Sequence, residues 1–191
     1  MNLTYSFAMI TRIIKECIYR ENTEGGLLEH VKTIIPIYYN EYGIDEPAIW
    51  ITQHPTFPVS DRKRNISQEV TLTTPFQFTC VEWDKDPEIA ELKGQELATL
   101  VGRAVQKNYL QVQKELNCPR RIAWIDINSY LPNGEVNIDG RSEKVPCTAI
   151  ILDVVHKIDW KNCCKQKNQQ NQQNSDSDSD NNEEDNGDLN G

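Results

Sequence analysis

Two aspartates, Asp126 and Asp153, have a residue type and a placement that could support acid–base chemistry. Asp126 lies in a run of β-forming residues, and Asp153 lies in the apolar run that closes the folded part, so the two are expected near each other in a sheet. A carboxylate pair of this kind can perform general acid–base catalysis. Polar residues near strand ends more often face solvent or an interface. We therefore expect no catalysis here, and the pair remains the basis of the rival, enzymatic interpretation.

The histidines and cysteines do not follow the spacing of a metal site. Zinc sites need paired ligands roughly two to four residues apart, whereas His30, His54 and His156 stand alone. His54 could act as a base, but a lone loop histidine usually has no such role. The six cysteines are expected to be reduced and packed as small hydrophobes, as in a cytosolic protein. They are Cys17, Cys80, Cys118, Cys147, Cys163 and Cys164.

Motifs for phosphate binding and nucleophilic catalysis are absent from the sequence. There is no G-x-G-x-x-G or G-x-x-x-x-G-K loop and no nucleophile elbow, and no Lys follows Gly25-Gly26. The four tryptophans could stack on a ligand, but core or interface packing is expected of them. They are Trp50, Trp83, Trp124 and Trp160. We accordingly expect a protein that is not an enzyme and needs no cofactor or metal.

Two helices are expected, with a third, shorter one possible. Apolar residues recur every three or four positions over residues 4–19, where Thr4 can cap the helix. Asp86-Pro87-Glu88 supplies a cap, a proline at the first helical position and an acid in the first turn of a helix that ends near Leu116. A short helix could run from Leu27 to Pro36. The long helix is expected to bury a stripe of Ile89, Leu92, Leu97, Leu100, Val101, Ala104, Val105 and Val112, with Gly94 and Gly102 allowing close packing.

The remaining apolar runs are typical of strands. Residues 69–83 alternate between apolar and hydroxyl side chains, although Pro75 makes this an edge strand, a bulged strand or two segments. Residues 120–130 also alternate, with Ile122, Trp124 and Asp126 on one side. Residues 145–158 are almost continuously apolar, which indicates burial on both faces. Further expected features are a strand at 48–52, an exposed loop at 54–68, and turns at Pro132-Asn133-Gly134 and Asp139-Gly140.

The charge balance argues against two classes of partner. The net charge of the 191-residue chain is −9, but residues 166–191 carry seven acidic side chains and one Lys, so the rest is close to neutral. Proteins that bind DNA or anionic membranes need clustered positive charge. No apolar stretch approaches the roughly 18 residues that span a bilayer, and residues 1–10 lack the basic region of a signal peptide.

These features predict an α+β fold. Residues 1–160 are expected to form a single domain, with a mainly antiparallel sheet flanked by the N-terminal helix and the long helix. Residues 161–191 are rich in Asn, Gln and Asp, with no aromatic residue beyond Trp160, and are expected to be a disordered acidic tail.

The order of features resembles the tail terminator, or tail completion, proteins of long-tailed bacteriophages. The relevant stretches are the first helix through Ile18, the segment 46–52 (EPAIWIT), the segment 73–79 (TTPFQFT) that leads into the long helix, and the closing strand at 148–156. The resemblance implies a small α/β subunit that forms a hexameric ring. Such a ring caps the tail tube and joins it to the head-side neck proteins in the virion, after assembly in the host cytoplasm.

Three alternatives remain beside this interpretation: another head–tail connector protein, a small-molecule-binding or enzymatic domain, and an adaptor whose acidic tail recruits basic partners. The expected partners are further copies of the chain, the tail tube and the connector, with DNA passing through without sequence-specific binding. Surfaces of such a ring must be polar yet carry charge for register. The hydroxyl-rich side of residues 71–79 is one candidate. The charged interface candidates are Arg62, Lys63, Arg64, Arg141, Glu143 and Lys144.

Overall fold

The computed structural model describes residues 7–36, 44–59, 69–118, 121–138 and 144–159. The chain divides into two units, Met1–Ile158 and Asp159–Gly191. Its elements follow one another as α1 (Phe7–Glu21), β1 (Thr33–Pro36), β2 (Ala48–Gln53), β3 (Phe57–Pro58), β4 (Glu69–Val81), α2 (Pro87–Glu115), β5 (Ile122–Val136) and β6 (Val145–Asp159). The acidic tail expected at 161–191 lies outside the described residues.

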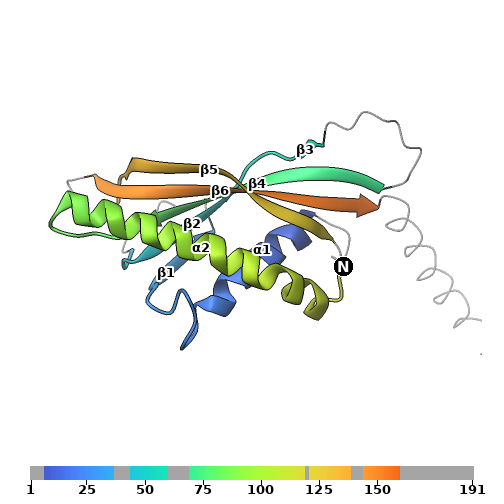
Figure 1. Cartoon of the computed structure of the whole chain (residues 1–191), viewed down its shortest axis with the longest axis horizontal. Coiled ribbons are helices and arrows are strands. Elements are labelled where there is room, and N and C mark those ends of the chain that lie inside the picture. Colours follow the sequence, from blue (N-terminus) through green and yellow to red (C-terminus); the bar gives the residue numbers. More distant parts are fainter. Residues whose placement is uncertain (1–6, 37–43, 60–68, 119–120, 139–143, 160–191) are drawn as a thin grey trace, which may run out of the picture. The chain divides into compact units, whose positions relative to one another are not determined.

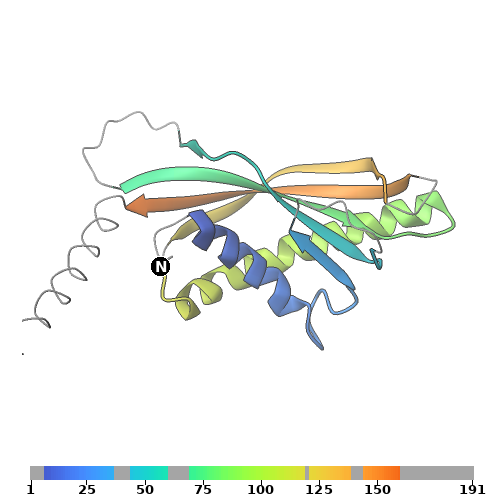
Figure 2. The same ribbon diagram turned by 180° about the vertical axis from the view of Figure 1, so that it is seen from behind.

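The six strands form one sheet in the order β1-β2-β4-β6-β5, with β3 paired to β4. β1 runs parallel to β2, whereas the pairs β2–β4, β3–β4 and β5–β6 are antiparallel. Both helices lie on the same face of the sheet, as the two opposite views show (Figures 1 and 2). This arrangement confirms the expected α+β fold with its mainly antiparallel sheet, N-terminal helix and one long helix.

The core fills the space between the helices and the sheet. Ile13, Ile14 and Ile18 of α1 are fully buried, as are Phe76 and Phe78 of β4. These side chains belong to one continuous apolar cluster that also includes residues of α2, β2 and β6. Burial of this apolar surface is the main favourable contribution to folding. The opposite face of the sheet carries a smaller cluster made of Val81, Ile138, Val145 and Cys147, with Ile44, Trp50 and Val136 packed against it.

The start of α2 follows its capping signal. Asp86 is the cap, and its Oδ1 accepts a hydrogen bond of 3.0 Å from the backbone N–H of Glu88. Pro87 occupies the first turn, where its missing N–H costs nothing. The helix ends at Glu115, one residue before the expected end.

The buried side of α2 differs from the expected stripe in its first turns. Ile89 and Leu92 were expected in the core but are 43% and 58% exposed. Small residues face the sheet instead, because this end of the helix approaches β6 closely: a Cβ on Gly94 would lie 3.3 Å from Thr148 Oγ1 and 3.6 Å from its backbone N. Farther along, a Cβ on Gly102 would lie 3.1 Å from Ile150 Cδ1, so both glycines allow the close packing that was expected.

The short helix expected from Leu27 to Pro36 is wrong. Turns occupy the segment after α1, and β1 follows, with Ile34 opposite Ile49 in parallel register. β-Branched residues fit a strand better than a helix. The side-chain amide of Asn22 donates to the carbonyls of Leu28 and Val31, at 2.7 and 2.9 Å, and thereby holds the turns in place of a helical ladder.

β4 is one continuous strand in the interior of the sheet, so the expected edge or interruption at Pro75 is wrong. β2 pairs with residues 76–81 of β4, and β3 pairs with Leu72 and Thr73. Pro75 falls in the interval where the neighbour changes from β2 to β3, and its carbonyl still accepts from the N–H of His54 at 2.9 Å. A proline is tolerated here because Pro75 lies between the part of β4 that pairs with β2 and the part that pairs with β3, where no ladder partner needs its missing N–H.

β5 is longer than expected, and the turn expected at Pro132-Asn133-Gly134 is wrong. These residues lie inside β5, where the register with β6 shifts between Leu131 and Gly134. Asn133 adopts a φ of 60°, a left-handed conformation that Asn tolerates better than most residues. The irregularity is therefore a bulge in the strand. The loop expected at 54–68 contains β3, and its residues 60–68 lie outside the described part, as does the turn expected at Asp139-Gly140.

Candidate functional site

The two carboxylates singled out in the sequence are cross-strand neighbours. Asp126 of β5 lies directly opposite Asp153 of β6. Asp126 is exposed and Asp153 is half-buried, and Asn128 Nδ2 donates to Asp153 Oδ2 at 2.8 Å. The expected proximity is thus confirmed. Within the part of the chain that the structure describes, no group of three or more His, Cys, Asp or Glu residues could hold a metal ion.

His54 and the tryptophans take separate places. His54 is half-buried at the end of β2, where its Nε2 lies 3.1 Å from Gln77 Oε1 of β4. Trp50 packs against the smaller apolar cluster, whereas Trp83 is exposed. Trp160 lies outside the described residues. Among the contacts of the described residues, neither His54 nor a tryptophan forms a hydrogen bond with Asp126 or Asp153.

Of the six charged interface candidates, only Lys144 lies in the described part. Its Nζ forms a 3.0 Å ion pair with Glu135 across the β5–β6 pair, and both side chains are exposed. An exposed pair of this kind contributes little to stability. Arg62, Lys63, Arg64, Arg141 and Glu143 lie outside the described residues, so their role remains a prediction.

The hydroxyl-rich side of β4 is less exposed than expected of an interface. Thr73 and Thr79 are buried, and Thr71 and Gln77 are only half-buried. The reason is that β4 is an interior strand: Thr79 lies opposite Trp50 of β2, and β6 flanks the other side. The side chains of both neighbouring strands help to cover an interior strand. Alternation of apolar and polar residues alone therefore does not make one of its faces accessible.

β5 carries four of the large apolar side chains that are exposed. Trp124, Ile127, Tyr130 and Leu131 are 47%, 57%, 41% and 48% exposed. Among the strands that the structure describes, β5 lies at the edge of the sheet and pairs only with β6. Strict alternation predicts Ile122 and Trp124 on one side, but a register shift between them leaves Ile122 buried and Trp124 exposed. The sequence gives no signal for this bulge, so the exposed strand was missed.

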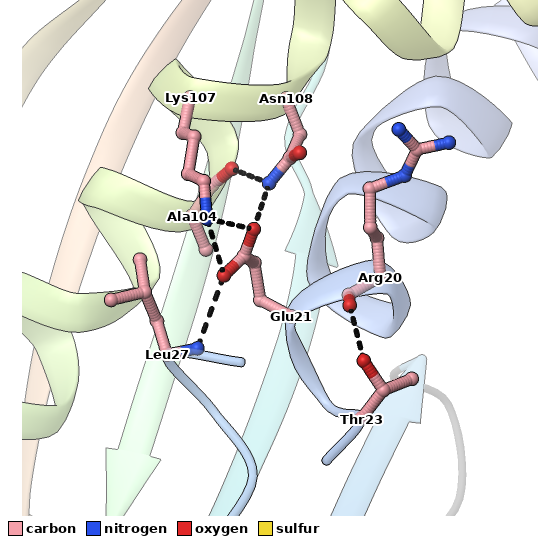
Figure 3. A network of polar contacts seen from close by, with 7 residues as sticks. All are labelled: Arg20, Glu21, Thr23, Leu27, Ala104, Lys107 and Asn108. Carbon is pink, nitrogen blue, oxygen red and sulfur yellow. Dashed lines mark hydrogen bonds and ion pairs between the residues drawn. The ribbon is translucent and has the colours of Figure 1, made fainter. Parts of the chain in front are cut away.

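A charge cluster around the buried Glu21 joins the two helices and was also missed in the sequence. Glu21, whose side chain is 4% exposed, accepts hydrogen bonds from Asn108 Nδ2 at 2.7 Å and from the N–H of Leu27 at 3.1 Å (Figure 3). Lys107 Nζ lies 2.9 Å from Glu21 Oε1. Burial alone would raise the pKa of Glu21, but the donors outweigh it and lower that pKa to about 2. This cluster connects α1, the following turns and α2, and its role is structural.

A second buried polar group lies beneath the start of α1. His156 is fully buried, its Nε2 lies 2.8 Å from Thr74 Oγ1, and Thr74 Oγ1 lies 2.7 Å from Thr56 Oγ1. The Phe7 ring meets the imidazole edge-on, with centroids 6.0 Å apart. Burial lowers the pKa of His156 to about 4. The imidazole is therefore neutral near pH 7 and is held as a core residue.

The cysteines in the described part are buried free thiols, as expected: they are Cys17, Cys80, Cys118 and Cys147. Burial raises the pKa of each thiol, that of Cys17 to about 12, so none of the four is a reactive thiolate near neutral pH. The cysteines at 163 and 164 lie outside the described residues.

Two comparisons with known proteins find no relative. No protein-family model matches the chain, and a search of curated proteins finds no match either. Among the described residues, no helix has the length and apolarity that a membrane span requires.

Proposed function

We propose that this chain is a structural subunit of a bacteriophage neck, a tail terminator that closes into a ring on the end of the tail tube. The observation that carries the proposal is β5, an edge strand of 15 residues with four large apolar side chains exposed along it. A long edge strand with exposed apolar side chains is a site of association. An assembly subunit accounts for such a strand more directly than a solitary domain does.

The charge distribution supports the same function. The net charge outside residues 166–191 is close to zero, so a ring of these subunits would not hold the phosphate backbone of passing DNA. The order of elements, from an N-terminal helix through a long capped helix to a closing strand, supports the resemblance to the tail terminator proteins on which this proposal draws. The ring would contact the tail tube on one side and the head connector on the other.

The test of this function is assembly. We expect the full-length chain to bind the ends of isolated tail tubes and to form closed rings there, visible by negative-stain imaging and countable by native mass spectrometry. The chain in solution should be monomeric or weakly associated, because the contacts that close the ring are completed on the tube. A chain that never associates with tubes or virions would contradict the proposal.

A charge-reversal variant tests the basic segment predicted to contact a neighbour. Changing Arg62, Lys63 and Arg64 together to Glu should leave the circular dichroism spectrum unchanged while blocking tail completion. The matched control reverses three exposed cations near and along α2, namely Lys85, Arg103 and Lys114, and should complete tails normally. Normal particles from the first variant would remove this segment from the interface.

The carboxylate pair is the basis of the remaining alternative, an enzymatic or ligand-binding domain. Asp126 is exposed and Asp153 is half-buried beside Asn128. Asp153→Asn, which leaves Asp126 unchanged, should still form rings if the protein is an assembly subunit. A ring-forming protein that loses a measurable ligand affinity on this change would favour the alternative.

A further inference from the structure

We propose that neighbouring copies of this chain join by extending the sheet: the outer edge of β5 in one copy pairs with the outer edge of β1 in the next. This inference rests on the proposed ring, and it names the surfaces that would close it. β5 and β1 are the strands at the two opposite edges of the sheet, so a contact between them joins two different surfaces of the chain. A closed ring requires such a heterologous contact.

The structure already closes part of the β5 edge by itself. At Ile122 the backbone N–H donates to Gln113 Oε1 at 2.6 Å, and the carbonyl accepts from Gln113 Nε2 at 3.3 Å. The Gln113 amide thus takes the place that a neighbouring strand would have. Among the described residues, no other side chain does this for positions 124–131, so the outer backbone groups there remain for water or a partner.

The exposed side chains of β5 favour a strand as the partner. Trp124 and Leu131 lie opposite Val155 and Ala149 on one side of the β5–β6 pair, while Ile127 lies opposite Leu152, a core residue, on the other. Apolar surface is therefore exposed on both sides of the same edge. A helix or a flat surface would cover one side, whereas an added strand covers both with its alternating side chains.

Proline and cationic side chains are missing from this part of β5. Residues 122–131 contain no proline, lysine or arginine, the residues that natural edge strands use against association. β1 does carry a proline, Pro36, but at its last position. Residues 124–127 of β5 form an unbroken stretch in register with β6, between the register shifts at 122/124 and 127/129. β1 has the same length, Thr33–Pro36.

Charge complementarity selects a second copy as the occupant. Asp126 is exposed and is the only charged residue within residues 122–131, and exposed Lys32 directly precedes β1. When β5 of one copy lies beside β1 of the next, these opposite charges come to the same interface. Such a pair contributes to register and specificity more than to affinity.

The experiment uses two charge reversals that are complementary if β5 pairs with β1. Asp126→Lys and Lys32→Glu are each measured in the full-length chain, by sedimentation velocity over a concentration series and by native mass spectrometry, with and without tail tubes. Each single variant places like charges at every interface, so self-association should weaken about tenfold or more. In an equal mixture, copies of the two variants can alternate, and every interface then joins one positive and one negative side chain again.

Association of the mixture should therefore return to within about twofold of the wild-type chain, and the assemblies should contain the two variants in equal numbers. The controls Glu96→Lys and Lys114→Glu, exposed on α2, should associate like wild type alone and mixed. A mixture that stays as weak as its components would overturn the pairing of β5 with β1, and so would single variants that associate normally.

The two proposals fail separately. Closed rings that survive both charge reversals would keep the ring and refute the edge pairing. Wild-type copies that pair through this contact but form open chains would keep the pairing and refute the ring. A wild-type chain that stays monomeric throughout the series, even with tubes present, would contradict the pairing.

Discussion

Gln113 in α2 and Ile122 at the start of β5 exchange two hydrogen bonds, so that a side-chain amide stands in for a strand at the edge of the sheet. Both residues are buried, so these contacts are shielded from solvent. The end of α2 is fixed beside them, because the N–H of Cys118 donates to the carbonyl of Gln113 at 2.9 Å and Asn117 adopts a φ of 53°. The pair thereby sets where the chain leaves the helix and enters β5.

Removing this amide should destabilise the fold. Gln113→Leu leaves the N–H and carbonyl of Ile122 without partners in a buried place, and we expect a loss of about 2–4 kcal/mol in the free energy of unfolding. Urea denaturation measures this loss, and hydrogen exchange at Ile122 should accelerate. Gln111→Leu on the exposed side of the same helix is the control and should change stability by less than about 0.5 kcal/mol. Equal effects of the two changes would contradict the role of Gln113.

Glu21 should make stability depend on pH at the acidic end. Its pKa is about 2 in the folded protein against 4.5 ordinarily, so the carboxylate stabilises the fold above pH 4.5. This contribution, up to about 3 kcal/mol, is lost as pH falls from about 4.5 to about 2. Glu21→Gln should be less stable near neutral pH and lack this part of the pH dependence in urea titrations. Glu16→Gln on the exposed side of α1 should behave like wild type.

His156 should produce a separate pH dependence at milder acidity. Its pKa is about 4 when folded and 6.5 ordinarily, so the unfolded chain takes up the proton first as pH falls. Stability should decline between about pH 6.5 and 4, by up to about 3 kcal/mol. His156→Gln keeps an amide near Thr74 and should remove this slope, whereas His30→Gln, at an exposed position, should retain it. A slope unchanged in His156→Gln would assign the titration to another group.

The exposed and buried leucines of α2 offer a matched comparison. Leu97 is buried in the main core and Leu92 is exposed. Leu97→Ala should lower the free energy of unfolding by about 2–5 kcal/mol through lost apolar contacts and the cavity left behind. Leu92→Ala should change it by less than about 0.5 kcal/mol. Thermal melts of the two variants test which side of the helix faces the sheet, and a similar Tm loss in both would contradict the packing described.

Local chemistry determined much of the architecture. The aspartate, proline and glutamate at 86–88 define where α2 begins, because capping depends on the neighbouring backbone alone. The almost continuously apolar run of β6 predicts its burial on both faces, and the structure bears this out. The proximity of Asp126 and Asp153 was anticipated because both fall in adjacent runs of one sheet. These features follow from residues close together in the sequence.

Only the tertiary structure decided the features that depend on distant partners. Ile34 and Ile35 form a strand because β2 offers a parallel neighbour, although their spacing also suits a helix. Pro75 lies in an interior strand because two different strands share that side of β4. A bulge of β5 exposes Trp124 and buries Ile122. Two of the donors to Glu21, Lys107 and Asn108, are more than 80 positions away along the chain, at sequence separations of 86 and 87. Periodicity reports which residues could share a face, but the partners that cover that face are fixed only when the chain folds.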